Sequence, residues 1–496
     1  MLTLATQTKK FGPTCLLTFI LLALFLAAGT AGAQVPLTQI STDTFTNSSS
    51  QHETEVEPAS YAVGSTIVSV FQVGRFTDGG SSDIGFSTST NGGTTWTHGS
   101  LPGITKIEGT GTYDRASDTS VTYNVKNKVW LAEVLALSAT GGPHGAAVLV
   151  SSSTDGITWN NPAVVSKVES GGYYDKPWIG CDNHPKSPFY GNCYVEWDDF
   201  SQFDLIEMST STDGGKTWSA KKTTSGQASG NGGLPLVQPN GTVIVPIDDP
   251  FLSSVLAFKS TDGGASWTAP VTVAFISEHF VAGNMRALPL IAAQIDAAGK
   301  VYVVWADCSF RTSCSSNDIV ISTSNDGTTW TAPARIPIDP VTSTVDHFTP
   351  GLTVKPGSSG STAAIGLSFY FFPKANCTTC NLSVGYVAST NGGATWSRRR
   401  TLTNGINPSW LASTTSGQMA GDYITAEIQG GVVHGIFASA KAPSGSTLNE
   451  ETFTNTTAVA DIAADEPQFS SANDKPVPNA HSDRPKRTTP HREDQR

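Results

Sequence analysis

The chain has 496 residues and 48 glycines, and only 14% of its residues are charged. Its formal net charge is −11 and it has no basic stripe, which argues against nucleic acid as a partner. Few charges, many glycines and abundant Ser and Thr favour short strands joined by tight turns over long surface helices. The composition therefore predicts a large all-β protein.

The N-terminus has the three parts of a secretory signal. Lys9 and Lys10 precede an apolar run that begins near Cys15, and A-G-A ends at Ala33. The run is shorter than the roughly 20 apolar residues of a membrane-spanning helix, so cleavage after Ala33 is predicted, with a membrane anchor as the alternative. The mature protein is then expected to be secreted, without a membrane span, and monomeric. The predicted segments are a signal peptide at 1–33, a folded domain at 34–457 and a disordered polar tail at 458–496.

Six related boxes recur within 34–457. They lie at Ser89–Trp96, Ser153–Trp159, Ser211–Trp218, Ser260–Trp267, Ser324–Trp330 and Ser389–Trp396, and the third reads S-T-D-G-G-K-T-W. Their tryptophans are spaced by 60 residues on average, and a fixed period of this length predicts stacked units. The Asp or Asn side chain accepts hydrogen bonds from turn amides while Gly takes positive-φ positions, so each box predicts a hairpin turn.

A second hairpin, richer in apolar residues, precedes each box, as at 120–134, 234–248 and 290–307. Two hairpins make one four-stranded sheet, and about 60 residues per sheet predicts a β-propeller. A seventh such hairpin, at 422–439, has no box after it. We therefore predict an all-β propeller of seven four-stranded blades, with six blades as the alternative. The N-terminal strand P-L-T-Q-I-S-T-D-T-F is expected to complete the last blade and close the ring.

The S-x-D-x-G-x-x-W box, repeated once per unit, resembles the Asp-box of the sialidase-like propellers, also called bacterial neuraminidase (BNR) repeats. The resemblance covers nearly all of 34–457. It implies that the boxes lie on outer turns, away from the active centre, so their aspartates are structural. Those aspartates are Asp155, Asp213, Asp262 and Asp326.

Functional side chains are expected at the axial mouth, where the inner strands converge. The resemblance implies three arginines that clamp a sugar carboxylate, a Tyr nucleophile activated by a Glu, and an Asp as acid/base. The candidate clamp is Arg75, Arg115 and Arg286. The candidate catalytic residues are Asp114, Asp118, Glu278 and Tyr423, with Tyr370 as the alternative to Tyr423. Asp175 and Trp178, in Y-D-K-P-W-I, are candidates for substrate binding, Trp178 by stacking on a sugar.

The chain also departs from the family pattern. The early Phe/Tyr-Arg-Ile-Pro motif is missing from the first blade, and R-I-P occurs only after the fifth box. Catalytic members have six blades, whereas the count here is seven. The predicted function is a secreted glycan-active protein, an exo-sialidase-type glycoside hydrolase acting on a carboxylated sugar. The alternatives are a polysaccharide lyase and a non-catalytic propeller that binds a glycan or a protein.

Six cysteines follow the predicted signal and fall into three close pairs. The pairs are Cys181 with Cys193, Cys308 with Cys314, and Cys377 with Cys380. Export favours disulfides over a metal site, for which nearby ligands at metal spacing are missing. No cofactor is predicted. Calcium at Asp198 and Asp199, or at Asp248 and Asp249, is the alternative, without a dedicated binding loop. His279 and His347 are expected to be loop residues without a catalytic role.

Overall fold

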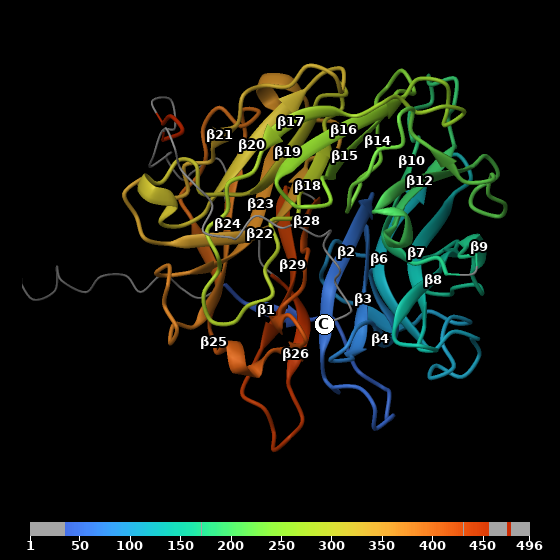
Figure 1. The fold of residues 1–496 in the computed structure, drawn as a ribbon, viewed down its shortest axis with the longest axis horizontal. Helices are drawn as coiled ribbons and strands as arrows, with labels where there is room; N and C mark the ends of the chain where they lie inside the picture. The colour runs from blue at the N-terminus through green and yellow to red at the C-terminus, as the bar shows by residue number, and fades with distance from the viewer. Residues whose placement is uncertain (1–34, 170, 430, 456–473, 478–496) are drawn as a thin grey trace, which may run out of the picture. The chain divides into compact units, whose positions relative to one another are not determined.

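The computed structural model describes residues 35–169, 171–429, 431–455 and 474–477. The predicted signal peptide and nearly all of the predicted tail lie outside these ranges. The described chain is all-β, and helical structure in it is limited to 3₁₀ turns of three residues (Figure 1). This agrees with a composition rich in Gly, Ser and Thr and poor in charge.

The strands form antiparallel sets of four, each consecutive in sequence except the last. The first three sets are β2 (Glu55–Val63), β3 (Thr66–Arg75), β4 (Ser81–Ser89) and β5 (Thr97–Ser100); β6 (Arg115–Asn124), β7 (Val129–Ser138), β8 (His144–Ser153) and β9 (Ala163–Lys167); and β10 (Tyr174–Cys181), β11 (Cys193–Asp199), β12 (Leu205–Ser211) and β13 (Lys222–Thr223). Single residue pairs join the third strand of one set to the first strand of the next, Ser81 of β4 with Ala116 of β6 and Gly145 of β8 with Tyr174 of β10.

The next three sets are separate sheets. They are β14 (Leu236–Val237), β15 (Val243–Asp248), β16 (Ser254–Ser260) and β17 (Val271–Phe275); β18 (Ala292–Ile295), β19 (Val301–Asp307), β20 (Asp318–Ser324) and β21 (Ala334–Arg335); and β22 (Asp346–Val354), β23 (Ile365–Phe372), β24 (Leu382–Ser389) and β25 (Arg400–Ile406). A small hairpin, β26 (Ala412–Thr414) and β27 (Gly417–Met419), follows them.

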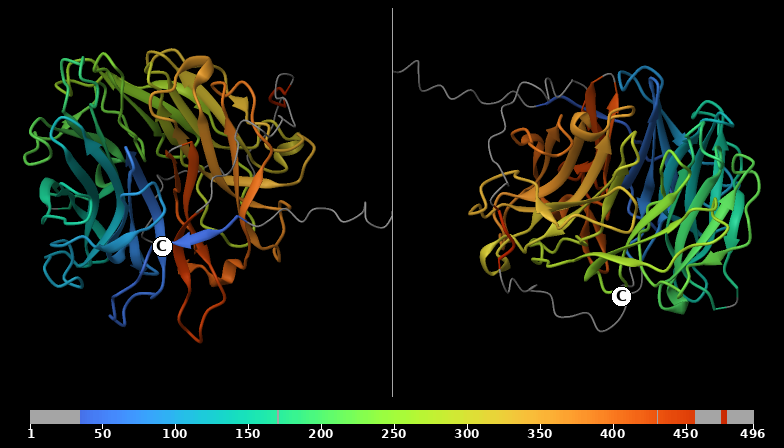
Figure 2. Two further views of the ribbon diagram at one scale, coloured as in Figure 1. Left: turned by 180° about the vertical axis from the view of Figure 1, so that it is seen from behind. Right: turned by 90° about the horizontal axis from the view of Figure 1, so that it is seen from above.

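The last set combines both ends of the domain. Its strands are β28 (Thr425–Gln429), β29 (Val432–Ala440), β30 (Glu450–Asn455) and the N-terminal strand β1 (Leu37–Gln39). Leu37 pairs with Asn455 and Gln39 with Phe453, so β1 occupies the edge of β30 (Figure 2). The N-terminal strand thus covers an edge that the C-terminal strands would otherwise leave open.

The first strands of the sets contact one another in cyclic order. β2 contacts β6, β6 contacts β10, and the series continues through β14, β18, β22 and β28 back to β2. Apolar residues fill the space between neighbouring sets, because most strands are buried on both faces, as β23 is along its whole length. The side chains of the first strands therefore converge on a common centre.

Each Asp-box forms the turn after the third strand of its set. In the second box, the Ser153 hydroxyl accepts a hydrogen bond from the Gly156 amide at 2.8 Å, and Asp155 accepts from the amides of Ile157 and Thr158 at 2.8 and 2.7 Å. These backbone bonds lower the pKa of Asp155 to about 2. The side chain of Asp155 is therefore committed to the turn.

We expect Asp155→Ala to destabilise the protein by about 1 kcal/mol, because the two turn amides lose a charged acceptor in a solvent-exposed position. Denaturant unfolding of the variant beside the parent chain measures this loss. Ligand binding should not change. A variant with parental stability would show that the carboxylate does not hold the turn.

Three disulfides join the cysteines of the described residues. Cys181–Cys193, Cys308–Cys314 and Cys377–Cys380 are bonded, which confirms the predicted pairs. Each closes a short loop within one set, so none of them links distant parts of the chain. The pattern is compatible with an extracellular protein. The described residues include no helix with the length and apolar character needed to cross a bilayer.

Candidate functional site

Four of the first strands, β2, β6, β10 and β22, have a β-bulge near their N-terminal ends. The register shifts between Val56 and Ala59 in β2, between Ser117 and Thr119 in β6, and between Asp175 and Trp178 in β10. A bulge leaves one residue unpaired and turns its side chain out of the regular alternation. The residues at the bulges of β2, β6 and β10 are Glu57, Asp118 and Lys176.

Two of these bulge residues have left-handed backbone conformations. The φ angle is 56° at Glu57 and 44° at Lys176, and each of them precedes a proline. Such conformations are unfavourable for residues with a side chain and persist where surrounding contacts hold them. The hydrogen bonds and ion pairs of Glu57 and Lys176, described next, stabilise these backbone conformations.

Lys176 connects aspartates from two other sets. Its Nζ lies 2.8 Å from Oδ1 of Asp118 and 3.1 Å from Oδ2 of Asp422. Arg286 approaches Asp422 from another side, with Nε 2.9 Å from Oδ1 and Nη2 2.7 Å from Oδ2. With Glu57 these residues form the axial cluster: Glu57, Asp118, Lys176, Arg286 and Asp422. Every member is at most 5% exposed.

In the axial cluster, burial raises the pKa of Glu57. Oε1 accepts a hydrogen bond from the Asp422 amide at 3.1 Å, and Oε2 accepts one from Nε2 of Gln72. Burial raises the pKa of Glu57 to about 8; the charges of Asp422 and Asp118 add to this, and that of Lys176 opposes it. Glu57 is therefore mostly protonated at neutral pH, which limits the negative charge of the cluster.

A cavity of about 360 Å³ begins beside the axial cluster and is lined by first strands. Asp118, Lys176, Trp178 and Tyr423 line one part of it, and Lys355 lines another. The rings of Trp178 and Tyr423 meet edge to face with centroids 5.2 Å apart. The cavity therefore combines aromatic surface with charged hydrogen-bonding groups, which is the usual character of a small-molecule site.

Tyr423 is a neutral phenol in this setting. Its hydroxyl accepts a hydrogen bond from the Thr119 amide at 3.0 Å. Burial, and then the charges of Glu57 and Asp118, hold the pKa of Tyr423 well above its ordinary value. Tyr370, the alternative, is buried and donates a hydrogen bond to the Ala438 carbonyl at 2.7 Å. The geometry thus shows Tyr423 as a cavity wall and as a hydrogen-bonding group.

The three predicted clamp arginines have different partners. Arg286 pairs with Asp422, whereas Nη1 of Arg75 donates to Oε1 of Gln72 at 2.8 Å. Arg115 lies 2.6 Å from Asp78, and its guanidinium covers the Phe76 ring at 3.9 Å. Arg75 and Arg286 are therefore in or next to the axial cluster, and Arg115 is held by a carboxylate outside it.

Three further predicted residues lie around the cluster. Asp114 pairs with Lys106 at 2.6 Å and accepts a hydrogen bond from the Ala139 amide, which with Lys106 lowers its pKa. Asp175 is buried and pairs across the strands with Asp198. Glu278 is buried in the segment before β18. The structure thus brings together Asp118, Arg286, Trp178 and Tyr423, and places Asp114 in a separate ion pair.

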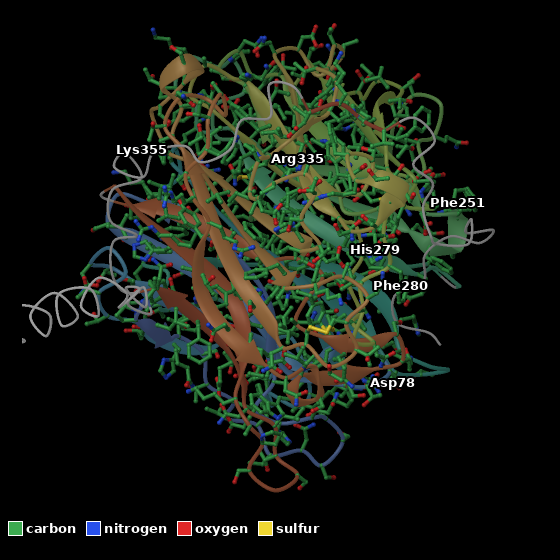
Figure 3. The ribbon with its side chains drawn as sticks, turned by 90° about the vertical axis from the view of Figure 1, so that its left-hand side faces the viewer. Asp78, Phe251, His279, Phe280, Arg335 and Lys355 are labelled. Atoms are coloured by element: carbon green, nitrogen blue, oxygen red, sulfur yellow. A yellow bond between two sulfur atoms is a disulfide. The ribbon has the colours of Figure 1, made fainter. Side chains whose placement is uncertain are left out.

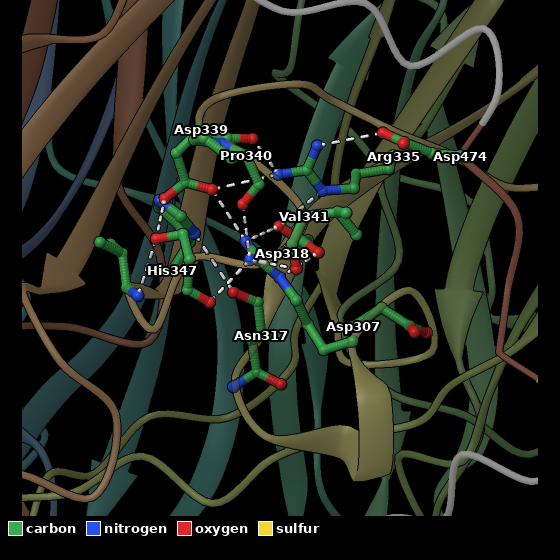
Figure 4. Close-up of polar contacts among 12 residues, drawn as sticks. Asp307, Asn317, Asp318, Arg335, Asp339, Pro340, Val341, His347 and Asp474 are labelled. Carbon is green, nitrogen blue, oxygen red and sulfur yellow. Dashed lines mark hydrogen bonds and ion pairs between the residues drawn. The ribbon is translucent and has the colours of Figure 1, made fainter.

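A second buried ionic cluster lies between the fifth and sixth sets (Figure 4). Arg311 binds both carboxylate oxygens of Asp318 and lies 2.8 Å from Asp339, while Arg335 lies 2.9 Å from Asp318 and 3.1 Å from Asp339. Nε2 of His347 is 3.5 Å from Asp339, and burial lowers the pKa of His347 to about 4. We name Arg311, Asp318, Arg335, Asp339 and His347 the arginine cluster.

The arginine cluster resembles a metal site only in its ligand types. Oxygen and nitrogen atoms of Asp318, Asp339 and His347 lie within 4.8 Å of one another. Two guanidinium groups already neutralise the two carboxylates, so a metal ion would meet like charge. One described tail residue also reaches this cluster, since Asp474 lies 3.2 Å from Arg335 (Figure 4). The cluster is therefore structural.

Glu57, Gln72, Lys176 and Asp422 are the site residues to which the sequence analysis assigned no role. A signal for Glu57 and Lys176 exists, because a proline follows the bulge position in several first strands. The prolines are Pro58, Pro177 and Pro350. The residue before each proline marks the same position in its set, and that position holds Glu57 in the first set and Lys176 in the third.

No family model and no curated protein sequence matches the chain. Among solved structures, the chain is similar to a protein of unknown function from Dyadobacter fermentans, with a TM-score of 0.46, 16% identity, and 72% of this chain and 99% of that one covered. It is similar to a PL25 ulvan lyase with a TM-score of 0.48, 10% identity and coverage of 84% and 95%. It is also similar to the NanB sialidase from Streptococcus pneumoniae, with a TM-score of 0.40, 14% identity and coverage of 84% and 70%.

Proposed function

We propose that the seven sets are blades of a propeller and that the protein is glycan-active. One sugar unit would bind in the cavity beside the axial cluster. The observation that carries this proposal is the pairing of Trp178 and Tyr423 beside Asp118 and Lys176 on one cavity wall. An aromatic face packs against the C–H face of a sugar ring, while charged groups hydrogen-bond its hydroxyls. The Asp-box resemblance supports the same class of ligand.

The charges of the axial cluster favour glycan binding over catalysis. Lys176 and Arg286 are already paired with Asp118 and Asp422, and the protonated Glu57 leaves the axial cluster close to neutral. A neutral sugar needs no further cation, whereas a sugar carboxylate would compete with Asp422 for both of them. We therefore place non-catalytic glycan binding first.

The second candidate is an exo-sialidase-type hydrolase acting on a carboxylated sugar, with a polysaccharide lyase as its variant. It is favoured by Asp118 and Tyr423, which line one end of the cavity, and by Arg286, which pairs with Asp422 in the adjoining axial cluster. Asp, Tyr and Arg are residue types that the resemblance implies. In such an enzyme Asp118 would serve as acid/base. The high pKa of Tyr423 requires that substrate binding change its surroundings before it could attack.

The decisive experiment is a binding screen of the purified chain on an array of neutral and acidic glycans, repeated with Trp178→Leu. We expect binding to weaken at least about tenfold, since loss of a central aromatic contact costs roughly 1.4 kcal/mol or more. Trp218→Leu is the matched control, because Trp218 is also half-buried but lies in an Asp-box turn. Equal affinity of the Trp178→Leu variant and the parent, or no glycan bound at all, would contradict the proposal.

Fluorophore release from an α-sialoside and from uncharged glycosides separates the two candidates. Release that is lost in both Asp118→Asn and Tyr423→Phe would favour the hydrolase. Binding without release on any substrate would favour the non-catalytic protein.

A further inference from the structure

Buried oxygen atoms without hydrogen-bond donors gather between the third and fourth sets. Asp198 is 0% exposed and Asp204 is 1% exposed. Among the described residues, no donor reaches either carboxylate oxygen of Asp198 or of Asp204, nor Oδ1 of the buried Asn231. Five acceptor atoms thus lie inside the protein with their lone pairs unused, and such groups are costly unless a ligand satisfies them.

The backbone brings these three residues to one place. Asp198 is in β11 and pairs with Ile206 of β12, two residues after Asp204. The carbonyl oxygen of Asp204 accepts a hydrogen bond from the Gly230 amide at 2.8 Å, and Asn231 is the next residue. Further along the same segment, the Gly233 amide donates to Oε2 of Glu196 at 3.0 Å, two residues before Asp198. The segment 230–233 therefore runs beside the strand that carries Asp198.

Acidic side chains gather here, and no hydrogen-bond donor of the described residues reaches the carboxylate of Asp198. Asp175 stands opposite Asp198 in the β10–β11 pairing, and like charges in that position repel. Lys176 is the nearby cation, but its ammonium group contacts Asp118 and Asp422. A bound cation would remove this repulsion.

We propose that Asp198, Asp204 and Asn231 form a calcium site between the third and fourth sets. Carboxylate and amide oxygens are the hard ligands that Ca²⁺ prefers, and its flexible coordination suits side chains from three separate segments. Ca²⁺ bound there would tie β11, the start of β12 and the segment 230–233 together. It would thus stabilise the contact between neighbouring sets close to the axial cluster.

The arginine cluster differs from this site in how its buried carboxylates are satisfied. There the two buried carboxylates of Asp318 and Asp339 are satisfied by Arg311 and Arg335. At Asp198 and Asp204 the corresponding guanidinium groups are missing from the described contacts. The same fold therefore uses arginine at one interface between sets and, by our inference, a divalent cation at another.

The test is calcium binding by the purified full chain after removal of divalent ions with EDTA. Added CaCl₂ should raise Tm by at least about 2 °C, because a ligand that binds only the native state stabilises it. Tb³⁺, which replaces Ca²⁺ at oxygen sites, should show luminescence sensitised by Trp197, which precedes Asp198 and is buried. Excess Ca²⁺ should quench that luminescence.

Asp198→Asn and Asp204→Asn should each abolish the calcium shift and the Tb³⁺ signal. Both variants should keep at least the Tm of the calcium-free parent, because removing a buried charge relieves repulsion; this separates loss of the site from loss of folding. Asp249→Asn is the control, since Asp249 caps the amides of Ser253 and Ser254 in a nearby loop. The proposal is overturned if the parent chain shows neither response, or if the Asp198 and Asp204 variants respond as the parent does.

Discussion

Arg311→Leu should lower the free energy of unfolding by about 3–5 kcal/mol, the cost of leaving buried carboxylates without their partner. Arg311 is 1% exposed, binds both oxygens of Asp318, and lies 2.8 Å from Asp339. Its Nη1 also donates to the carbonyl oxygens of Pro340, Val341 and Ser343 at 2.8–2.9 Å. A leucine of similar volume restores none of these contacts, so the loop between the fifth and sixth sets loses its anchor.

Urea unfolding monitored by tryptophan fluorescence measures this loss. Lys106→Met is the matched control, because it removes a cation from an ion pair with Asp114 in which the lysine is 60% exposed. That variant should lose less than about 1 kcal/mol. If the two variants were equally stable, the arginine cluster would not contribute to the fold as the geometry implies.

Lys176→Met should also destabilise the protein by about 3–5 kcal/mol, and it should do so at the axial cluster. The variant removes the ammonium group that lies 2.8 Å from Asp118 and 3.1 Å from Asp422. Both aspartates are at most 2% exposed, so water does not replace the lost partner. Arg286 still holds Asp422, and Asp118 therefore carries most of the penalty.

Lys355→Met tests whether any lysine of the cavity would give the same result. Lys355 lines the same cavity but is exposed. It also lies well away from Asp78, the partner of Arg115, in Figure 3. Its replacement should change stability by no more than about 0.5 kcal/mol. Asp118→Asn combined with Lys176→Met should recover part of the stability, because both charges of the pair are then absent. Failure of that double variant to recover any stability would contradict the assignment.

The local parts of the fold could be predicted because they depend on neighbouring residues. The box at 211–218 determines its own turn, since Ser211, Asp213 and Gly215 bond within it. The three disulfides follow from closely spaced cysteines. The pairing of β1 with β30 could be predicted because the last set otherwise lacked a strand.

The partners within the site could not be predicted in the same way. Lys176 and Asp422 are 246 residues apart in sequence, and only the packing of the third set near the last one brings them together. The sequence shows that Arg286 and Arg115 are cations near strand ends, but not that Asp422 and Asp78 neutralise them. Glu57 was missed because a bulge reverses the side chain that regular alternation would assign to that position.

The pairing of β1 with β30 also determines when the last set can form during synthesis of the chain. Leu37 is among the first residues of the folded domain to be made, and its partner Asn455 is among the last. The last set therefore cannot form until synthesis has passed residue 455, and its closure joins the two most distant parts of the domain. Until then the edge of β2 has no neighbour from the last set, and the nascent chain remains incompletely folded. The contact between the two ends of the domain is therefore available only to a chain that has been synthesised past β30.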